Sequence, residues 1–229
     1  VHEGCVRKEL PVLIITTLGV GALMWDGTLS RLDGVLMMMV LVVLLVHLVR
    51  AESKDPHLLE EAGDEPLPDL PPLRAWLTFL LGLALLIGSS KLLVYGAVLA
   101  AQELGVSELI IGLTIVAIGT SLPELAATIA SAMRGHTEIA LGNIIGSNLF
   151  NLLAVMSIPG MITPQVLDPE VMSRDYYTMT ALTIFFAVAI LISRKRTKSS
   201  PGHAYLGRIL GTVLVSCYGL YYYLLHTTI

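Results

Sequence analysis

The stretch GLTIVAIGTSLPELAATIASAMRGHTEIALGNIIGSNLFN, residues Gly112–Asn151, decides how this chain is organised. It is apolar enough to lie in a lipid bilayer, yet it contains the carboxylate of Glu124, a proline and three asparagines. An ionisable side chain at membrane depth costs roughly 3 kcal/mol on insertion scales, so its default interpretation is a functional site. We therefore interpret this stretch as half of a cation-binding site in a transporter.

The composition is that of an integral membrane protein. Of the 229 residues, 55% are hydrophobic and 14% are charged, whereas a soluble domain carries about 25% charged residues. The expected surroundings are therefore a lipid bilayer. There is no basic stripe with interleaved aromatic residues, so we expect no nucleic-acid partner. The two cysteines, Cys5 and Cys217, lie at opposite ends of the chain and are expected to be free thiols.

Seven apolar segments, separated by short polar ones, predict seven transmembrane helices. A spanning helix needs about 20 residues. Backbone groups in lipid must be satisfied internally, and the segments are too long for barrel strands, so the predicted class is all-α. The segments are residues 11–26, 34–49, 75–100, 106–133, 136–163, 176–193 and 204–225.

The distribution of Lys and Arg predicts the orientation. If the chain enters the first helix from the cytoplasm, eleven of the 14 Lys and Arg residues flank helices on the inside. Only Arg31 and Arg174 flank helices on the outside. Because basic residues accumulate on the cytoplasmic side, we expect residues 51–74 in the cytoplasm and the C-terminus outside. The lack of a large cytoplasmic domain suggests a prokaryotic plasma (inner) membrane.

The chain divides into two related parts around an acidic, Pro-rich linker. Residues 1–50 hold two predicted helices, residues 51–74 are the linker, and residues 75–229 hold five. The pattern Arg31–x–x–Gly34 recurs as Arg208–x–x–Gly211, each time opening an apolar run. The first two helices would thus correspond to the last two in opposite orientation, which is the inverted-repeat plan of many secondary transporters.

Pro123 predicts a broken helix in the middle of the stretch. It lacks an N–H, and its ring clashes with the carbonyl of Gly119, so the helix must kink nearby and free backbone oxygens. At 100° per residue, four residues lie within an arc of about 60°. They are Ala117, Ser121, Glu124 and Thr128, with Thr120 beside Glu124. Carboxylate, hydroxyl and carbonyl oxygens are hard donors that suit Ca²⁺ or Na⁺.

A second polar stripe follows on the next helix, beyond the RGHT turn at residues 134–137. Asn143, Ser147 and Asn151 are spaced i, i+4, i+8, and Gly142 and Gly146 flank them. A Gly-x-x-x-Gly pair allows another backbone to approach closely. The two stripes together provide oxygen donors from two neighbouring helices.

Structural explanations for these residues stay open. Glu124 would be a structural carboxylate if it paired with Lys91, although that pair would explain neither Pro123 nor the second stripe. Ser147 and Asn151 would serve packing if they only made interhelical hydrogen bonds. Lys91 itself is most simply a residue whose long side chain extends to the interface.

The motifs GTSLPEL at 119–125 and GNIIGSNLFN at 142–151 closely resemble the second α-repeat of the sodium/calcium exchanger family, within the cation/calcium exchanger superfamily. The resemblance is to the bacterial inner-membrane members and covers essentially the whole chain, from the fourth helix of a ten-helix inverted-repeat fold onward. It implies a transporter and not an enzyme, with no cofactor. Ca²⁺ and Na⁺ would compete for one midplane site built from both α-repeats, by alternating access.

The resemblance also assigns roles to particular residues. Glu124 would be the principal carboxylate ligand, Thr120 and Ala117 would contribute oxygens from the broken helix, and Ser147 would bind from the facing helix. Some members carry Asp where this chain has Asn151. Ser121 and Asn143 complete the candidate metal site, because they lie on the same two stripes.

One carboxylate does not neutralise Ca²⁺, so a partner carboxylate is expected from an N-terminal repeat that these residues lack, in the same gene or in a partner chain. Two alternatives to Ca²⁺/Na⁺ antiport remain. In a Ca²⁺/H⁺ antiporter, Glu124 would carry a proton as it titrates. In the other alternative, the chain is a membrane fragment that is inactive in transport.

Overall fold

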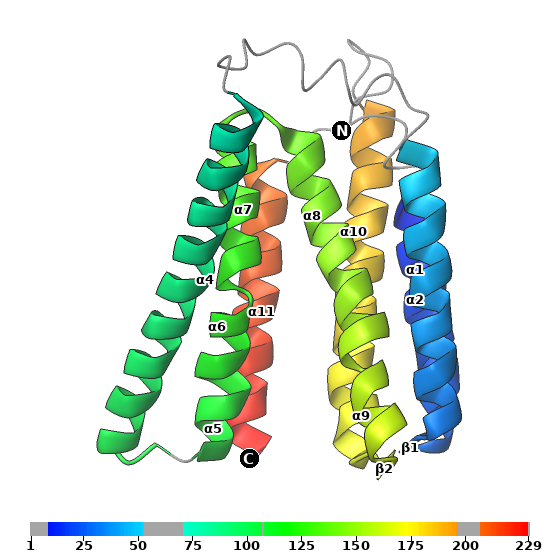
Figure 1. Ribbon diagram of the computed structural model, residues 1–229. Helices are drawn as coiled ribbons and strands as arrows, with labels where there is room; N and C mark the ends of the chain where they lie inside the picture. Colours follow the sequence, from blue (N-terminus) through cyan, green and yellow to red (C-terminus); the bar gives the residue numbers. More distant parts are fainter. Residues whose placement is uncertain (1–8, 53–70, 107, 197–206, 229) are drawn as a thin grey trace. The chain divides into compact units, whose positions relative to one another are not determined.

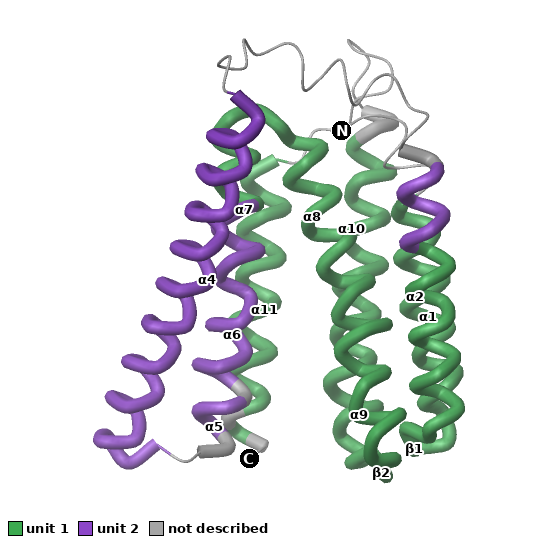
Figure 2. The backbone as a smooth tube through the Cα atoms, viewed as in Figure 1, with its two compact units in different colours: residues 1–44, 128–229 green, residues 45–127 purple. Residues whose placement is uncertain are grey.

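The computed structural model describes residues 9–52, 71–106, 108–196 and 207–228, and nearly all of them are helical, which confirms the all-α class (Figure 1). They form two compact units, residues 1–44 with 128–229 and residues 45–127 (Figure 2). Two helices pass from one unit into the other, namely α2 (Arg31–Glu52) and α7 (Leu122–Met133). The predicted linker, residues 51–74, lies mostly outside the described residues, as does Cys5.

The larger unit, residues 1–44 with 128–229, contains elements from both ends of the chain. It begins with α1 (Leu10–Leu23), the 3-10 turn η2 (Met24–Asp26), β1 (Thr28–Leu29) and the first part of α2. It resumes in α7 and continues through α8 (Thr137–Phe150), the π-helical segment η4 (Asn151–Val155) and α9 (Ser157–Ile162). It ends with β2 (Gln165–Val166), the π-helical segment η5 (Val171–Tyr176), α10 (Tyr177–Arg196) and α11 (Arg208–Thr228).

Helix α1 packs against α8, η4 and α10 and contributes to both apolar clusters of the larger unit. At its start, Leu10 and Leu13 are buried with Leu141 and Ile145 of α8 and with residues of α10. One cluster therefore joins α1, α8 and α10. The other joins the end of α1 to α2, η4 and η5, and its buried members are Val20, Met24, Leu29, Met37, Leu41, Leu152, Leu153, Ala154 and Tyr176.

The backbones of α2 and α9 touch at two glycines. A Cβ placed on Gly34 would lie 2.7 Å from the carbonyl oxygen of Ser157 and 2.8 Å from the nitrogen of Met161. A Cβ on Gly160 would lie 3.1 Å from the carbonyl oxygen of Ser30. Small residues are what allow helices in lipid to approach this closely. The residues Gly34 and Gly160 therefore fix the contact between the second predicted helix and the fifth.

The start of α2 is fixed by a capping box and a short strand pair. The Ser30 N–H donates to the carboxylate of Asp33 at 2.9 Å, and the Asp33 N–H donates to the Ser30 hydroxyl at 3.2 Å. These bonds satisfy N–H groups that a helix start leaves without partners. Strand β1 pairs antiparallel with β2, Thr28 opposite Val166. The loop before α2 is thus joined to the loop after α9.

The smaller unit, residues 45–127, is dominated by the long helix α4 (Pro72–Glu103). Pro72 stands in the first turn, where its missing N–H costs nothing. Gly105, with φ +77°, ends the helix by the Schellman pattern, with Gly105 N–H to Gln102 and Val106 N–H to Ala101. The chain then returns through α5 (Glu108–Ile111), the π-helical segment η3 (Gly112–Val116), α6 (Ala117–Thr120) and the start of α7.

Within the described residues, five helices are long and apolar enough to cross a membrane, and a bent pair adds a sixth if it counts as one span. The long ones are Arg31–Arg50, Pro72–Glu103, Thr137–Ile162, Val171–Ser193 and Arg208–Leu225, and the bent pair is Thr114–Thr120 with Leu122–Met133. The remaining predicted span corresponds to the shorter apolar helix Leu10–Asp26. Seven helical apolar segments are therefore present, whereas seven spans remain a prediction, as does the orientation.

Candidate cation-binding site

The predicted helix break is present at Ser121. Helix α6 ends at Thr120 and α7 begins at Leu122 (Figure 1). The segments Thr114–Thr120 and Leu122–Met133 are bent by 46° relative to each other. The Ser121 N–H bonds to Ile118 at 3.1 Å, three residues back, as in a tightened last turn. Because Pro123 cannot donate a hydrogen bond to Gly119, the ladder must stop here. The arc of about 60°, which assumed one straight helix, therefore does not extend across Ser121.

The carbonyl oxygens at the break already accept hydrogen bonds. The Thr120 hydroxyl donates to the carbonyl of Ala117 at 3.0 Å. N–H groups at the end of α6 donate to the carbonyls of Ile118 and Gly119. A carbonyl oxygen has two lone pairs, so each of these atoms keeps one for a second partner. The carbonyl oxygens at the end of α6 are therefore partly hydrogen-bonded, and each can still accept one further partner.

Glu124 lies in the first turn of α7 and is half-buried. The carbonyl end of α6 carries partial negative charge and the N–H end of α7 carries partial positive charge. The first turn of α7 is therefore a favourable place for a carboxylate, and the end of α6 is a favourable place for a cation. Thr128, four residues later on α7, is also half-buried. The break thus brings a carboxylate and oxygen donors together at one point in the chain.

Helix α6 is held in place by Gly119. This residue is buried, and an added Cβ would meet the side chain of Val94 on α4. Helices α4 and α6 are neighbours within the smaller unit. Gly119 therefore lets the segment with the candidate carbonyls lie directly against α4. Lys91, on the same helix α4, is exposed.

The second stripe belongs to the larger unit, on α8 and η4. Asn143 and Ser147 are half-buried on α8, whereas Asn151 is exposed and begins the π-helical segment. Its carbonyl accepts the Met156 N–H at 3.3 Å, five residues on. Such π-turns inside helices are frequent at functional sites. A Cβ on Gly142 or Gly146 would meet no described atom within 4 Å, so no described element makes the predicted close approach there.

A hydrogen bond crosses between α7 and α8. The Asn143 side-chain nitrogen donates to the Thr128 hydroxyl oxygen at 2.7 Å. The turn between the two helices ends α7 by the Schellman pattern, because Gly135 has φ +85° and the His136 N–H bonds to Ser131 at 2.9 Å. The RGHT turn was predicted from the sequence, but the Thr128–Asn143 pairing was not.

The candidate residues are divided between the two units. Ala117, Thr120, Ser121 and Glu124 belong to the unit of residues 45–127, and Ala117 and Thr120 are in direct contact. The other candidates, Asn143, Ser147 and Asn151, belong to the larger unit, where Asn143 contacts Thr128. Each set of residues is described within its own unit, and a single site formed by both sets stays a prediction.

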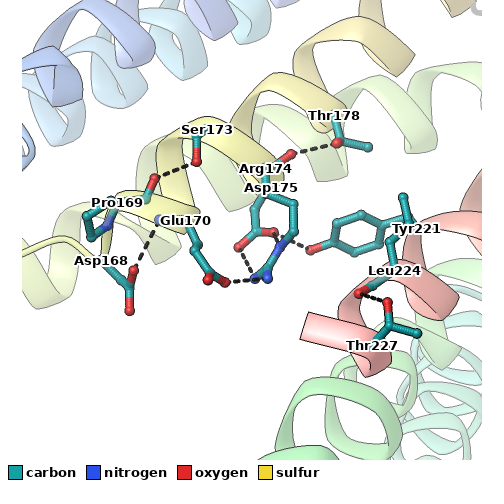
Figure 3. Close-up of polar contacts among 10 residues, drawn as sticks. All are labelled: Asp168, Pro169, Glu170, Ser173, Arg174, Asp175, Thr178, Tyr221, Leu224 and Thr227. Carbon is teal, nitrogen blue, oxygen red and sulfur yellow. Dashed lines mark hydrogen bonds and ion pairs between the residues drawn. The ribbon is translucent and has the colours of Figure 1, made fainter. Parts of the chain in front are cut away.

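A polar network that the sequence did not predict lies at η5, just before α10 (Figure 3). Arg174 donates through Nε to Asp175 at 2.6 Å and also pairs with Glu170. From α11, the Tyr221 hydroxyl donates to Asp175 at 3.0 Å. Because these charges are paired with one another, the cluster is a link between η5 and α11 rather than a cation site.

The fold and the broken, carboxylate-bearing helix define a polytopic membrane protein of the ion-transporter class. The chain belongs to the sodium/calcium exchanger protein family, whose match covers residues 74–226. This family consists of transporters, which confirms both the predicted family and the prediction that the protein is not an enzyme.

Similar proteins include bacterial and archaeal membrane proteins. The chain is 41% identical over 227 residues to a protein named antiporter CaxA from Alkalimonas amylolytica, covering 97% of this chain and 69% of that protein. It is 39% identical to the inner membrane protein YrbG of Escherichia coli, over 82% of this chain and 59% of YrbG. It is 40% identical to the sodium/calcium exchanger MaX1 of Methanosarcina acetivorans, over 49% of this chain and 32% of MaX1.

A solved structure shares the fold. The sodium-calcium exchanger NCX_Mj, in a crystal soaked with zero Na⁺ and Ca²⁺, superposes with a TM-score of 0.71 at 22% identity. The match covers 96% of this chain and 65% of NCX_Mj. Over the matched part, the chain therefore has the helical architecture of this exchanger.

Proposed function

We propose that the protein exchanges Ca²⁺ for Na⁺ across a membrane by alternating access. The ion would bind near the bilayer midplane, at a site formed by two α-repeats, one of which is Gly112–Asn151. The observation that carries this proposal is the half-buried Glu124 in the first turn after a helix break. A charge at membrane depth is costly, so its presence there favours a role in an ion pathway. Membership of the exchanger family supports the same conclusion.

The donor set suits a hard cation that must be released again. Ca²⁺ takes six to eight oxygen ligands, and Glu124 supplies the charge while neutral oxygens complete the shell. The neutral donors would be the Ala117 carbonyl, the hydroxyls of Thr120, Ser121 and Ser147, and the amide oxygens of Asn143 and Asn151. Within the described residues, no group of three or more His, Cys, Asp and Glu forms a metal cluster. A low charge count favours weak binding and therefore release.

The second carboxylate would come from a counterpart repeat. One Glu leaves a divalent ion with uncompensated charge, and desolvating such a pair is unfavourable. The chain covers 69%, 59% and 32% of the three relatives named above. We infer that a second α-repeat, from the same gene or from a partner chain, faces Gly112–Asn151 in the working transporter.

The protonation state of Glu124 distinguishes the two possible coupling ions. If Na⁺ is the counter-ion, it occupies the same oxygens as Ca²⁺ in the opposite half of the cycle, and Glu124 stays ionised throughout. If H⁺ is the counter-ion, Glu124 must be protonated when Ca²⁺ leaves. Asn151 carries no charge, so Glu124 is the single titratable ligand among the seven candidates.

Uptake into vesicles tests the proposal. The product of the complete gene is reconstituted in liposomes loaded with Na⁺, diluted into Na⁺-free medium containing ⁴⁵Ca²⁺, and compared with vesicles that have equal Na⁺ on both sides. We expect uptake only with the outward Na⁺ gradient. Uptake that ignores Na⁺ but follows an imposed pH gradient would show that the protein is a Ca²⁺/H⁺ antiporter instead.

The proposed location is a prokaryotic inner membrane. The name of the related inner membrane protein YrbG supports this location. We keep the predicted orientation, with residues 51–74 in the cytoplasm and the C-terminus outside, because it follows from the Lys and Arg distribution. In this orientation α7 descends toward the cytoplasm, the RGHT turn lies there, and α8 returns.

A further inference from the structure

We infer that Thr128 and Asn143 form a positioning pair that sets the register of α7 against α8. This inference rests on the proposed cation exchange. It gives Asn143, which the sequence pattern placed among the ligands, a role in positioning the two helices. It also adds Thr128, which is not among the predicted ligands.

The bond itself is direct and sheltered. The Asn143 amide nitrogen donates to Thr128 Oγ1 at 2.7 Å, and both side chains are half-buried. The partners are 15 residues apart, on either side of the Gly135 turn. The amide nitrogen is a donor and repels a cation, so its use in this bond commits that end of Asn143 to the protein.

Threonine in an apolar helix commonly bonds a carbonyl one turn back on its own helix. Several threonines here do so. Among them are Thr17 to Leu13 at 2.8 Å, Thr114 to Ile110 at 2.5 Å and Thr183 to Met179 at 2.9 Å. Thr128 differs, because its oxygen accepts a hydrogen bond from a side chain of the next helix. In a bilayer such interhelical bonds help to fix how two helices lie together.

The pair is well placed to act on the proposed ligands. Thr128 follows Glu124 by four residues on α7, and Asn143 precedes Ser147 by four residues on α8. Residues four apart lie on the same face of a helix, one turn from each other. A slip of either helix at the Thr128–Asn143 bond would therefore move the ligand one turn away by a similar amount. The Schellman turn at Gly135 limits such slips from the other side.

The experiment is a double-mutant cycle in the product of the complete gene, reconstituted in vesicles for Na⁺-driven ⁴⁵Ca²⁺ uptake. Thr128→Val removes the hydroxyl and keeps the shape, Asn143→Leu removes the amide, and the double variant removes both. We expect each single variant to raise the half-saturating Ca²⁺ concentration about three- to twenty-fold, the factor that an interhelical hydrogen bond is worth in a membrane. The half-saturating Ca²⁺ concentration of the double variant should be no higher than that of the more impaired single variant. The maximal uptake rate of all variants should stay within about twofold of the wild-type rate.

Two controls accompany the cycle. Thr128→Ser keeps the hydroxyl and should restore wild-type half-saturation. Thr183→Val removes a half-buried hydroxyl that bonds its own helix, and it should leave half-saturation unchanged. Thermal unfolding of the four proteins of the cycle in detergent measures the bond without any ion, and the effects of the two single variants should again be non-additive.

Different results overturn the two proposals. If wild-type vesicles show no Na⁺-driven uptake, the proposed function fails, while unfolding still reports on the bond. If wild-type protein transports and Thr128→Val equals it while Asn143→Leu abolishes uptake, Asn143 acts without Thr128 and the positioning role is wrong. Additive unfolding effects, or lower stability with unchanged half-saturation, would also contradict it.

Discussion

The close contact between α2 and α9 depends on the absence of a side chain at Gly34. An added Cβ would meet the backbone of α9 at Ser157 and Met161, neither of which can rotate away. Overpacking of this kind costs about 1–3 kcal/mol. We therefore expect Gly34→Ala to lower the free energy of unfolding of the detergent-solubilised protein by that amount, as measured by thermal unfolding.

The matched control is Gly211→Ala. Gly211 occupies the corresponding place in the Arg-x-x-Gly pattern, on α11, but an added Cβ there meets no described atom within 4 Å. Its replacement should leave stability unchanged or raise it slightly, because Ala is the better helix former. Equal loss in both variants would show that the contact of α2 with α9 does not depend on Gly34.

Glu124 and Pro123 could be singled out from the sequence because their chemistry is local. A carboxylate in an apolar run is costly whatever surrounds it, and Pro breaks the hydrogen-bond ladder of its own helix. Gly34 and Gly160 could not be singled out, because their importance depends on which other helix arrives. The same holds for Asn143, whose partner lies 15 residues away.

At the scale of helices, the break at Ser121 is the feature on which the proposed site depends. Pro123→Ala restores the missing N–H and removes the clash with the Gly119 carbonyl. We expect the α6–α7 segment to straighten, with unchanged or higher thermal stability and Na⁺-driven Ca²⁺ uptake reduced at least tenfold. Circular dichroism, thermal unfolding and uptake measure the three quantities.

Pro11→Ala is the control for this change. Pro11 lies in the first turn of α1, where a missing N–H leaves no bond unmade, so neither stability nor uptake should change appreciably. Normal transport in Pro123→Ala would mean that the break is not needed for ion binding. The site would then have to be sought elsewhere in the helix.

The helices themselves were predictable and their irregular turns were not. In the described residues, each of the seven apolar segments is mainly helical, and the break falls at the predicted residues. The π-helical segments at 112–116, 151–155 and 171–176 were missed. A π-turn shifts one hydrogen-bond register by a single residue, and that shift leaves no trace in composition or hydrophobic periodicity.

At the scale of the whole molecule, the chain is a set of membrane helices from one exchanger family, arranged in two units. The bulk composition was enough to place it in a bilayer. The sequence could not show how many apolar helices span, because α1 is shorter than a full bilayer crossing. The division of the candidate ligands between two units also could not be predicted, since it depends on contacts between distant helices.

The central claim is that Glu124 binds the transported cation, and its most direct test is Na⁺-driven ⁴⁵Ca²⁺ uptake by Glu124→Gln. This change removes the charge and keeps the size of the side chain, so the protein should insert and unfold as the wild type does. Glu103→Gln, at the exposed end of α4, is the matched control and should transport normally. We predict that Glu124→Gln reduces uptake to the level of protein-free vesicles, whereas uptake close to that of Glu103→Gln would contradict the account.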